Sequence, residues 1–365
     1  MRLLRTATSM PITLKQLSLL AGAHPSTVAR VLHADPRQRV SAELRERILT
    51  LAREHDYRPN SVARSLRTKR TAVFGALIPD IANPFFASVL RGMEDAVAER
   101  DYSIILANTD DLPAREAHSL GMLRDRQVDG LLLATARVND PAIAQLTAER
   151  VPFVLVNRHT EPITPNAVVP DDYGGGVAAV EHLLALGHRR IAHISGAGDT
   201  STGSLRRQAY LDTLRKHEVD RFPDQAALDI KGSFREAGGF AAMNTLLELA
   251  EIPTAVFAVN DLAALGAIRA IMAAGLRVPQ DISVIGFNDL FHATHMMPAL
   301  TTIQVPHRAM GARAAQLLLD MVVDGVVPEQ PVLLPASLIV RESTGPAPQR
   351  RPGSRVRRTN VTRTK

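Results

Sequence analysis

The chain has 365 residues, of which 45% are hydrophobic and 4% aromatic, and it contains neither Cys nor Trp. This length allows two or three domains, whose cores must consist mainly of Leu, Val, Ile and Ala. The absence of Cys excludes disulfides, thiolate metal ligands and Cys nucleophiles, and it suits a reducing compartment.

No run of about 18 apolar residues occurs, so we expect no membrane span. The first ten residues are basic but lack the apolar stretch of a signal peptide, which favours a cytoplasmic protein. The start of translation stays open between Met1 and Met10.

Charge is distributed unevenly along the chain, whose net charge is +6. Residues 1–70 hold 14 Lys and Arg against 5 Asp and Glu, residues 345–365 hold 7 against 0, and residues 71–344 hold 22 against 32. Basic ends therefore flank an acidic body. A solvated basic face is the simpler explanation of a charge run alone, but a basic front end is also typical of proteins that bind a polyanion such as nucleic acid.

The front of the chain carries the pattern of three short helices. Thr13 can cap the first helix together with Gln16, and Gly22 can end it. The second helix can begin at Pro25, and a third fits Ser41–His55. Two short helices joined by a turn that contains Gly predict a helix-turn-helix unit, whose second helix enters the DNA major groove.

The segment "YRPNSVARSLRTKR", residues 57–70, predicts one further short helix capped by Asn60. A helix of about two turns is marginal in water. We therefore expect residues 58–68 to be helical only against another surface.

From residue 72 onward, apolar strands alternate with helices. This alternation predicts α/β architecture with two doubly wound parallel-sheet subdomains, whose ligands bind beyond the carboxyl ends of the strands. A turn rich in Pro separates the two sets at residues 162–170. The expected strands are 72–79, 102–108, 130–134, 153–157, 190–195, 255–259, 282–287 and 332–340, and the expected helices are 84–100, 113–126, 141–150, 173–186, 205–217, 235–250, 261–274 and 309–324.

Several segments resemble one known family in order and spacing. They are "TLKQLSLLAG", "STVARVLH", "VSAELRERI" and "YRPNSVARSL" in the front unit, and "PDIANPFF", "GHRRIAHISG", "VNDLAALGA", "VPQDISVIGFND", "PALTTI" and "VRES" in the body. The chain resembles the lactose-repressor (LacI/GalR) family of bacterial transcription regulators. The resemblance implies a periplasmic-binding-protein-like body with three chain crossovers, a homodimer, a near-palindromic DNA operator and a small-molecule effector such as a sugar.

The expected domains follow from these segments. They are a helix-turn-helix DNA-binding domain at 11–57, a hinge helix and linker at 58–70, an effector-binding and dimerisation core at 71–344, and a disordered basic tail at 345–365.

In the front unit, the resemblance implies that Pro25, Ser26 and Arg30 read the major groove and that Thr27 holds a phosphate. Leu66 matches a hinge leucine that enters the minor groove and kinks the duplex; its alternative role is ordinary hinge packing. The full set implied for DNA binding is Thr13, Pro25, Ser26, Thr27, Arg30, Ser41, Asn60, Ala63 and Leu66.

The front unit departs from the family at His24, where a Ser or Thr N-cap is usual, and at Ala29 and His33. His is a poor cap, so we expect a weaker start of the second helix. The side chain of Pro25 cannot hydrogen-bond a base edge, so the operator sequence is expected to differ from the common one.

In the body, Asn side chains that follow the strand ends suit a polyhydroxylated ligand. Arg206 and Phe234 match an effector-binding arginine and a stacking aromatic residue of the family. Asn288 stands where Asp is common, which leaves the particular sugar open, and helix capping is the alternative role of Asn260. The expected effector-binding set is Phe85, Asn108, Asn157, Arg206, Phe234, Asn260 and Asn288.

Two patterns imitate other sites. "GDTSTGS", residues 198–204, resembles a phosphate loop but lacks its lysine. His292 and His295 have no third ligand at a suitable spacing. We therefore expect no metal, no cofactor and no catalytic residues.

A DNA-binding transcriptional regulator, and by family habit a repressor, is the function that we expect. The alternative is a solute-binding protein without DNA binding, which would need an export signal and no front unit. Whether the effector releases or promotes DNA binding stays open, as does the choice between dimer and tetramer. The tail either adds non-specific DNA affinity or has no function.

Overall fold

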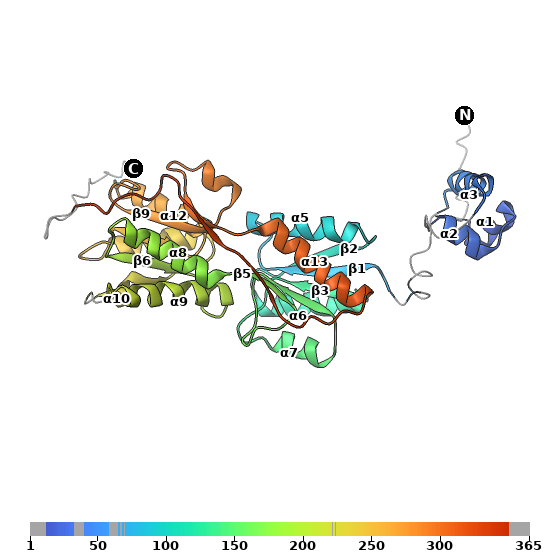
Figure 1. The fold of residues 1–365 in the computed structure, drawn as a ribbon, viewed down its shortest axis with the longest axis horizontal. Helices are drawn as coiled ribbons and strands as arrows, with labels where there is room; N and C mark the ends of the chain where they lie inside the picture. The colour runs from blue at the N-terminus through green and yellow to red at the C-terminus, as the bar shows by residue number, and fades with distance from the viewer. Residues whose placement is uncertain are drawn as a thin grey trace, which may run out of the picture. The chain divides into compact units, whose positions relative to one another are not determined.

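The structure is a computed structural model that describes residues 12–32, 40–57, 65, 68, 70–220, 222 and 224–349. These residues form two compact units, divided between Thr71 and Ala72 (Figure 1). Each unit is described by itself below.

The N-terminal unit consists of three helices around a small apolar core. The helices are α1 (Leu14–Ala21), α2 (Pro25–Leu32) and α3 (Ala42–Glu54). One stripe of each helix supplies the core, which is Leu17, Ala21, Val28, Val31, Ile48 and Ala52. The expected helices are therefore confirmed.

Caps define the starts of these helices. The Oγ1 atom of Thr13 accepts from the N–H of Gln16, and the Gln16 side chain accepts from the N–H of Thr13, which completes a capping box. Gly22 ends α1 in the left-handed conformation, with φ 63°. The Oγ atom of Ser41 accepts from the N–H of Leu44 at 3.3 Å and so caps α3.

The structure shows how His24 meets the start of α2, whose expected weakness stays a prediction. The Nδ1 atom of His24 accepts from the backbone N–H of Ser26 at 3.3 Å and lies 2.7 Å from its Oγ atom. The imidazole therefore supplies the acceptor that a Ser or Thr hydroxyl provides elsewhere, as long as Nδ1 carries no proton.

The first sheet of the body is entirely parallel and has the strand order β11-β5-β4-β3-β1-β2. Figure 1 shows α5 and α13 on one side of this sheet and α6 and α7 on the other. Alternate residues of its strands belong to the apolar cores on these two sides. Its elements are β1 (Val73–Ile78), α5 (Pro84–Ala98), β2 (Ser103–Asn108), α6 (Pro113–Asp125), β3 (Gly130–Leu133), α7 (Pro141–Ala148), β4 (Phe153–Val156), β5 (Ala167–Pro170), α13 (His307–Val323) and β11 (Val332–Leu334).

Helices α5 and α13 approach each other closely. A Cβ atom added at Gly92 would lie 2.0 Å from the carbonyl oxygen of Arg308, and one at Gly311 would lie 1.9 Å from that of Val89. Only glycine fits at these two positions, so the two helices are packed backbone against backbone.

The second sheet has the order β12-β10-β9-β8-β6-β7, in which only the β10–β12 pair is antiparallel. Helices α8 and α9 pack together on one face, and α11 and α12 pack together on the other. Its elements are α8 (Asp172–Ala185), β6 (Ile191–Ser195), α9 (Ser201–Lys216), α10 (Gln225–Leu228), β7 (Asp229–Lys231), α11 (Glu236–Leu247), β8 (Ala255–Ala258), α12 (Asp261–Ala273), β9 (Ser283–Asn288), the 3-10 helix η1 (Phe291–Thr294), β10 (Thr301–Gln304) and β12 (Ser337–Ile339).

The chain crosses between the two sheets three times. The crossings run from β5 to α8, from β10 to α13 and from β11 to β12. The two doubly wound subdomains and their three crossovers agree with expectation.

The sequence prediction differs from the structure in several elements. Residues 332–340 form two strands instead of one, since Pro335 lacks an N–H and interrupts the pairing; β11 joins the first sheet and β12 the second. The prolines of residues 162–170 concealed β5, and the short β7, α10 and β10 were also missed. Helix α9 begins at Ser201, four residues earlier than predicted.

The body extends beyond the predicted boundary at residue 344. The N–H of Gly345 donates to Ser283 at 3.1 Å, and the N–H of Ala347 donates to the carbonyl of Leu186 at 2.9 Å. Residues 345–349 therefore belong to the second subdomain, and the rest of the predicted tail lies outside the described residues. Within the described part of the chain, none of the helices is long and apolar enough to cross a membrane.

His193 is fully buried on β6, between β8 and the edge strand β7. Its ring stacks between Tyr210 and Phe257, and burial lowers its pKa to about 4. The folded protein thus keeps His193 neutral between pH 6.5 and 4, whereas the unfolded chain binds a proton there. The contribution of neutral His193 to the unfolding free energy is therefore complete above pH 6.5 and is lost as the pH falls toward 4.

Replacing His193 by Phe should keep the stacking and remove this loss. Between pH 7 and pH 4.5, the unfolding free energy of the unmodified protein should fall by roughly 2–3 kcal/mol more than that of His193→Phe. Urea unfolding followed by circular dichroism measures this difference. His295→Phe, at an exposed histidine, is the control, and an equal difference in both variants would contradict the assignment.

Candidate functional site

In the N-terminal unit, α2 presents the residues that the sequence suggested for DNA binding. Ser26 and Arg30 are exposed, and Pro25 and Thr27 are half-buried in the first turn. Thr13 and Ser41 are exposed as well, but their hydroxyls already cap α1 and α3. The hinge candidates Asn60, Ala63 and Leu66 lie outside the described residues.

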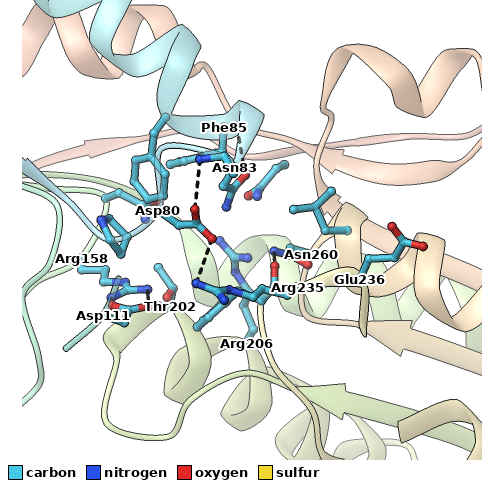
Figure 2. A pocket seen from close by; sticks show the side chains of 17 residues that line it. Asp80, Asn83, Phe85, Asp111, Arg158, Thr202, Arg206, Arg235, Glu236 and Asn260 are labelled. Carbon is cyan, nitrogen blue, oxygen red and sulfur yellow. Dashed lines mark hydrogen bonds and ion pairs between the residues drawn. The ribbon is translucent and has the colours of Figure 1, made fainter. Parts of the chain in front are cut away.

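The body contains a cavity of about 250 Å³ to which both subdomains contribute. Six of the seven predicted effector residues line it, namely Phe85, Asn157, Arg206, Phe234, Asn260 and Asn288. Figure 2 shows that polar side chains from several different elements converge there. The loops after parallel strands thus meet in one place, as the fold class predicts.

Asn157 and Asn288 face the cavity from different subdomains. Asn157 follows β4 with φ 67°, and Asn288 ends β9 with φ 115°. Each side chain is buried, and neither Oδ1 atom has a hydrogen-bond partner among the described residues. Since an unpaired buried acceptor is costly, these two atoms are suited to accept hydrogen bonds from a ligand. A φ of 115° is rare for a residue other than Gly and is typical of functional sites.

Arg206 is held by a fully buried ion pair. Its Nε and Nη2 atoms lie 2.8 and 2.7 Å from Oδ1 of Asp172, and Nη1 donates to the carbonyl of Val259 at 2.7 Å. Its guanidinium also stacks on Phe287, 3.6 Å from the ring centre. Burial raises the pKa of Asp172 and lowers that of Arg206, and the pairing opposes both shifts.

Arg158 reaches the cavity from the first subdomain. Its guanidinium binds Asp111 through Nη1 at 2.7 Å and Nη2 at 3.4 Å, and it lies 5.4 Å from the ring centre of Phe234. Its Nε atom is buried and has no hydrogen-bond partner among the described residues. Three residues that line the cavity thus each hold one unpaired buried polar atom, namely the Nε of Arg158 and the Oδ1 atoms of Asn157 and Asn288.

Asn260 serves the cavity indirectly. Its Oδ1 atom accepts from the N–H of Ala263 at 2.8 Å and caps α12, and its Nδ2 atom donates to the carbonyl of Phe234 at 2.9 Å. Helix capping, the alternative role considered for this residue, is thus observed. The following Asp261 is buried, and burial raises its pKa to about 7.

The remaining predicted residue, Asn108, does not line the cavity. Its Oδ1 atom accepts from the N–H of Ile81 at 2.7 Å, and its Nδ2 atom donates to Asp110 at 2.6 Å. Asn108 ends β2, which is the edge strand of the first sheet. Its side chain therefore positions the loop that follows β1.

Sequence reasoning missed several polar residues of the cavity. Asp80 and Arg158 follow the ends of β1 and β4, so the strand-end rule could have found them. Arg235 and Glu236 follow the unrecognised β7, and nothing in their sequence context marked them. The missed polar lining is Asp80, Asn83, Asp111, Arg158, Thr202, Arg235 and Glu236.

The phosphate-loop-like segment at residues 198–204 and the histidine pair His292 and His295 have structural roles. Within residues 198–204, Thr200 caps α9 through the N–H of Gly203 at 3.2 Å. His295 lies near the carbonyl of Phe291 at 3.1 Å. Among the described residues, no group of three or more His, Asp and Glu side chains could hold a metal ion.

Comparison with known families places both units in one protein class. Residues 13–60 match the model described as "Bacterial regulatory proteins, lacI family", and residues 180–344 match the periplasmic binding protein-like domain. The ribose operon repressor of Escherichia coli (strain K12) is 33% identical over 91% of this chain and 99% of its own length. The chain belongs to the lacI family. It is a DNA-binding transcriptional regulator controlled by a small-molecule effector.

Solved structures of relatives share this architecture. The lac repressor dimer bound to operator and the anti-inducer ONPF is 28% identical, matches 92% of this chain and 100% of its own, and has a TM-score of 0.81. A LacI family transcriptional regulator from Enterococcus faecium with bound ribose is 33% identical, matches 75% of this chain and 99% of its own, and has a TM-score of 0.66.

The buried ion pair of this regulator gives a stability prediction. Arg206→Met leaves the Asp172 carboxylate buried without a partner and should lower the unfolding free energy of the body by about 3–5 kcal/mol. The double variant Asp172→Leu, Arg206→Met should regain most of this loss, since two apolar side chains replace the pair.

Urea unfolding followed by circular dichroism measures both effects. Arg215→Met on the same helix is the matched control, because Arg215 forms an exposed ion pair with Asp212 that contributes less than about 1 kcal/mol. A single variant Arg206→Met as stable as this control would show that the pair is not required.

Proposed function

We propose that the chain is a homodimeric repressor that binds a near-palindromic operator through α2. A neutral, polyhydroxylated effector binds in the cavity and thereby lowers or raises the affinity for the operator. The observation that carries the proposal is the pair of unused buried oxygens of Asn157 and Asn288, one from each subdomain. They accept hydrogen bonds, and sugar hydroxyls donate them. A ribose operon repressor and a ribose-bound regulator among the relatives support a ligand of this class.

The charges of the cavity favour an uncharged ligand. Arg158, Arg206 and Arg235 line it, and each is paired with a carboxylate, those of Asp111, Asp172 and Asp80 respectively. A ligand carboxylate or phosphate would have to compete for an arginine that is already neutralised. A neutral sugar needs only the unused donor and the two unused acceptors.

DNA binding is proposed for the exposed face of α2. Ser26 and Arg30 lie on this face, and an arginine can bind the O6 and N7 atoms of guanine in a bidentate manner. One helix-turn-helix unit covers only a half-site, which supports a dimer on a two-fold operator. The similar lac repressor structure is a dimer bound to operator. We expect the protein to act in the bacterial cytoplasm, because its operator DNA is located there. The hinge role of Leu66 remains a prediction for a residue outside the described part.

Arg30→Ala should weaken operator binding by roughly 1–3 kcal/mol and leave binding to random DNA much less changed. Fluorescence anisotropy with both DNAs over a range of salt concentrations measures this. Arg53→Ala, which removes the same charge from α3, is the control. Equal losses on both DNAs would make Arg30 a phosphate contact.

The effector can be identified by thermal shift with a panel of pentoses, hexoses, their uronic acids and their phosphates. Neutral sugars should raise the melting temperature, and the acids and phosphates should not. Asn157→Ala and Asn288→Ala should each weaken binding of the identified sugar by about 1–3 kcal/mol. Both variants should bind the operator normally without effector. A panel in which only charged sugars bind would refute the neutral ligand.

A further inference from the structure

An ion pair joins the two subdomains across the cavity. Arg235, immediately before α11, places Nη2 3.0 Å from a carboxylate oxygen of Asp80, in the loop after β1. Both residues line the cavity, and Figure 2 shows the dashed line that connects them. The contact therefore joins lining residues of the two subdomains directly.

The sheet order puts this contact away from the crossovers. Strands β5 and β11 of the first sheet and β10 and β12 of the second carry the three chain crossings, and all four lie toward one edge of their sheets. Asp80 follows β1 and Arg235 follows β7, which lie toward the opposite edges. If the crossovers act as the hinge of the body, this ion pair lies where opening moves the subdomains furthest apart.

Local hydrogen bonds hold the carboxylate in position. One oxygen of Asp80 accepts from the N–H of Ala82 at 3.0 Å, which leaves the other for Arg235. Asn108 accepts from the N–H of Ile81 and so fixes the same loop. The Asp80 side chain is 24% exposed and that of Arg235 is 61% exposed, so solvent and salt screen the pair in part.

A second bridge reinforces the first. Arg137, in the loop after β3, lies 3.3 Å from the carboxylate of Asp199, and the carbonyl of Asp199 accepts from the N–H of Val138 at 2.9 Å. Glu116 binds Arg137 from the other side at 3.0 Å. The contacts between the subdomains are thus not limited to the crossovers.

We propose that Asp80 and Arg235 form a clasp that keeps the cavity closed and slows the exchange of the effector. They are positioning residues: they stabilise the closed arrangement in which Asn157 and Asn288 face the same space. The role of the cavity rests on the proposed function, but the clasp acts on the body whether or not a ligand is bound. Partly exposed ion pairs are modest, so breaking the clasp should raise the open fraction about two- to fivefold.

Single-molecule energy transfer tests the clasp without any effector. Because the chain has no cysteine, His118→Cys on α6 and Asn244→Cys on α11 give one exposed labelling site in each subdomain. Labelled full-length protein is diluted with an excess of unlabelled protein, so that each dimer carries one labelled chain. The measured quantity is the fraction of molecules in the low-transfer, open arrangement.

Asp80→Asn and Arg235→Gln should each raise the open fraction about two- to fivefold, and the double variant should open no further than either single variant, because each alone already breaks the same ion pair. Raising NaCl from 0.1 to 1 M should open the unmodified protein but change Arg235→Gln little, since the Debye length falls from about 10 to 3 Å. The matched control is Arg277→Gln, whose ion pair with Asp281 is similarly exposed but lies within one subdomain.

An open fraction that is the same in Asp80→Asn, Arg235→Gln and the control would overturn the clasp, as would a double variant that opens further than either single variant. These outcomes do not depend on the result of the thermal-shift test with the panel of sugars. If no sugar binds but the two variants open, the proposed ligand class is wrong and the clasp stands. If sugars bind and the variants stay closed, only the clasp is wrong.

Discussion

The parallel arrangement of the strands is the constraint on which the cavity depends. Parallel strands end at the same edge of a sheet, so the loops that follow them gather there. In the first sheet these loops bring Asp80 and Asn157 to the cavity, and in the second they bring Thr202, Asn260 and Asn288. Three crossings between the sheets keep the two edges opposed. The ligand site is therefore a consequence of topology, and no single segment contains it.

Charge is buried beside the cavity, and it is paired within the protein itself. Arg206 on α9 is neutralised by Asp172 at the start of α8 and also occupies the carbonyl of Val259 at the end of β8. A buried charge pair contributes little net stability, but the loss of either partner is costly. The pair thus fixes the relative positions of three elements around the cavity, which suits a site that must present the same lining in each molecule.

The sequence predicted the site as far as local patterns could reach. Strands, helices and their order followed from alternation, and six predicted residues meet at the cavity because they follow strand ends or match family positions. Asn108 fulfils the same local rule, yet it does not line the cavity, because its amide is used by Ile81 and Asp110, whereas Asp111 of the same loop does line it. Which side chain of a loop reaches the cavity depends on the contacts between loops, which no local pattern shows. Likewise, the interruption at Pro335 was visible, but the assignment of its flanking strands to different sheets was not.

A ligand can shift a conformational equilibrium only through its different affinity for the two states. Here the unused oxygens that suit a ligand belong to different subdomains, so only the closed arrangement offers both at once. Closure also brings the Arg158 guanidinium over the Phe234 ring of the other subdomain. A ligand that bridges Asn157 and Asn288 loses one of its two hydrogen bonds when the subdomains open. It therefore favours the closed state by the free energy of that hydrogen bond. The ion pair of Asp80 and Arg235 favours the same closed state. It therefore lowers the binding free energy that the ligand must contribute to shift the equilibrium to that state.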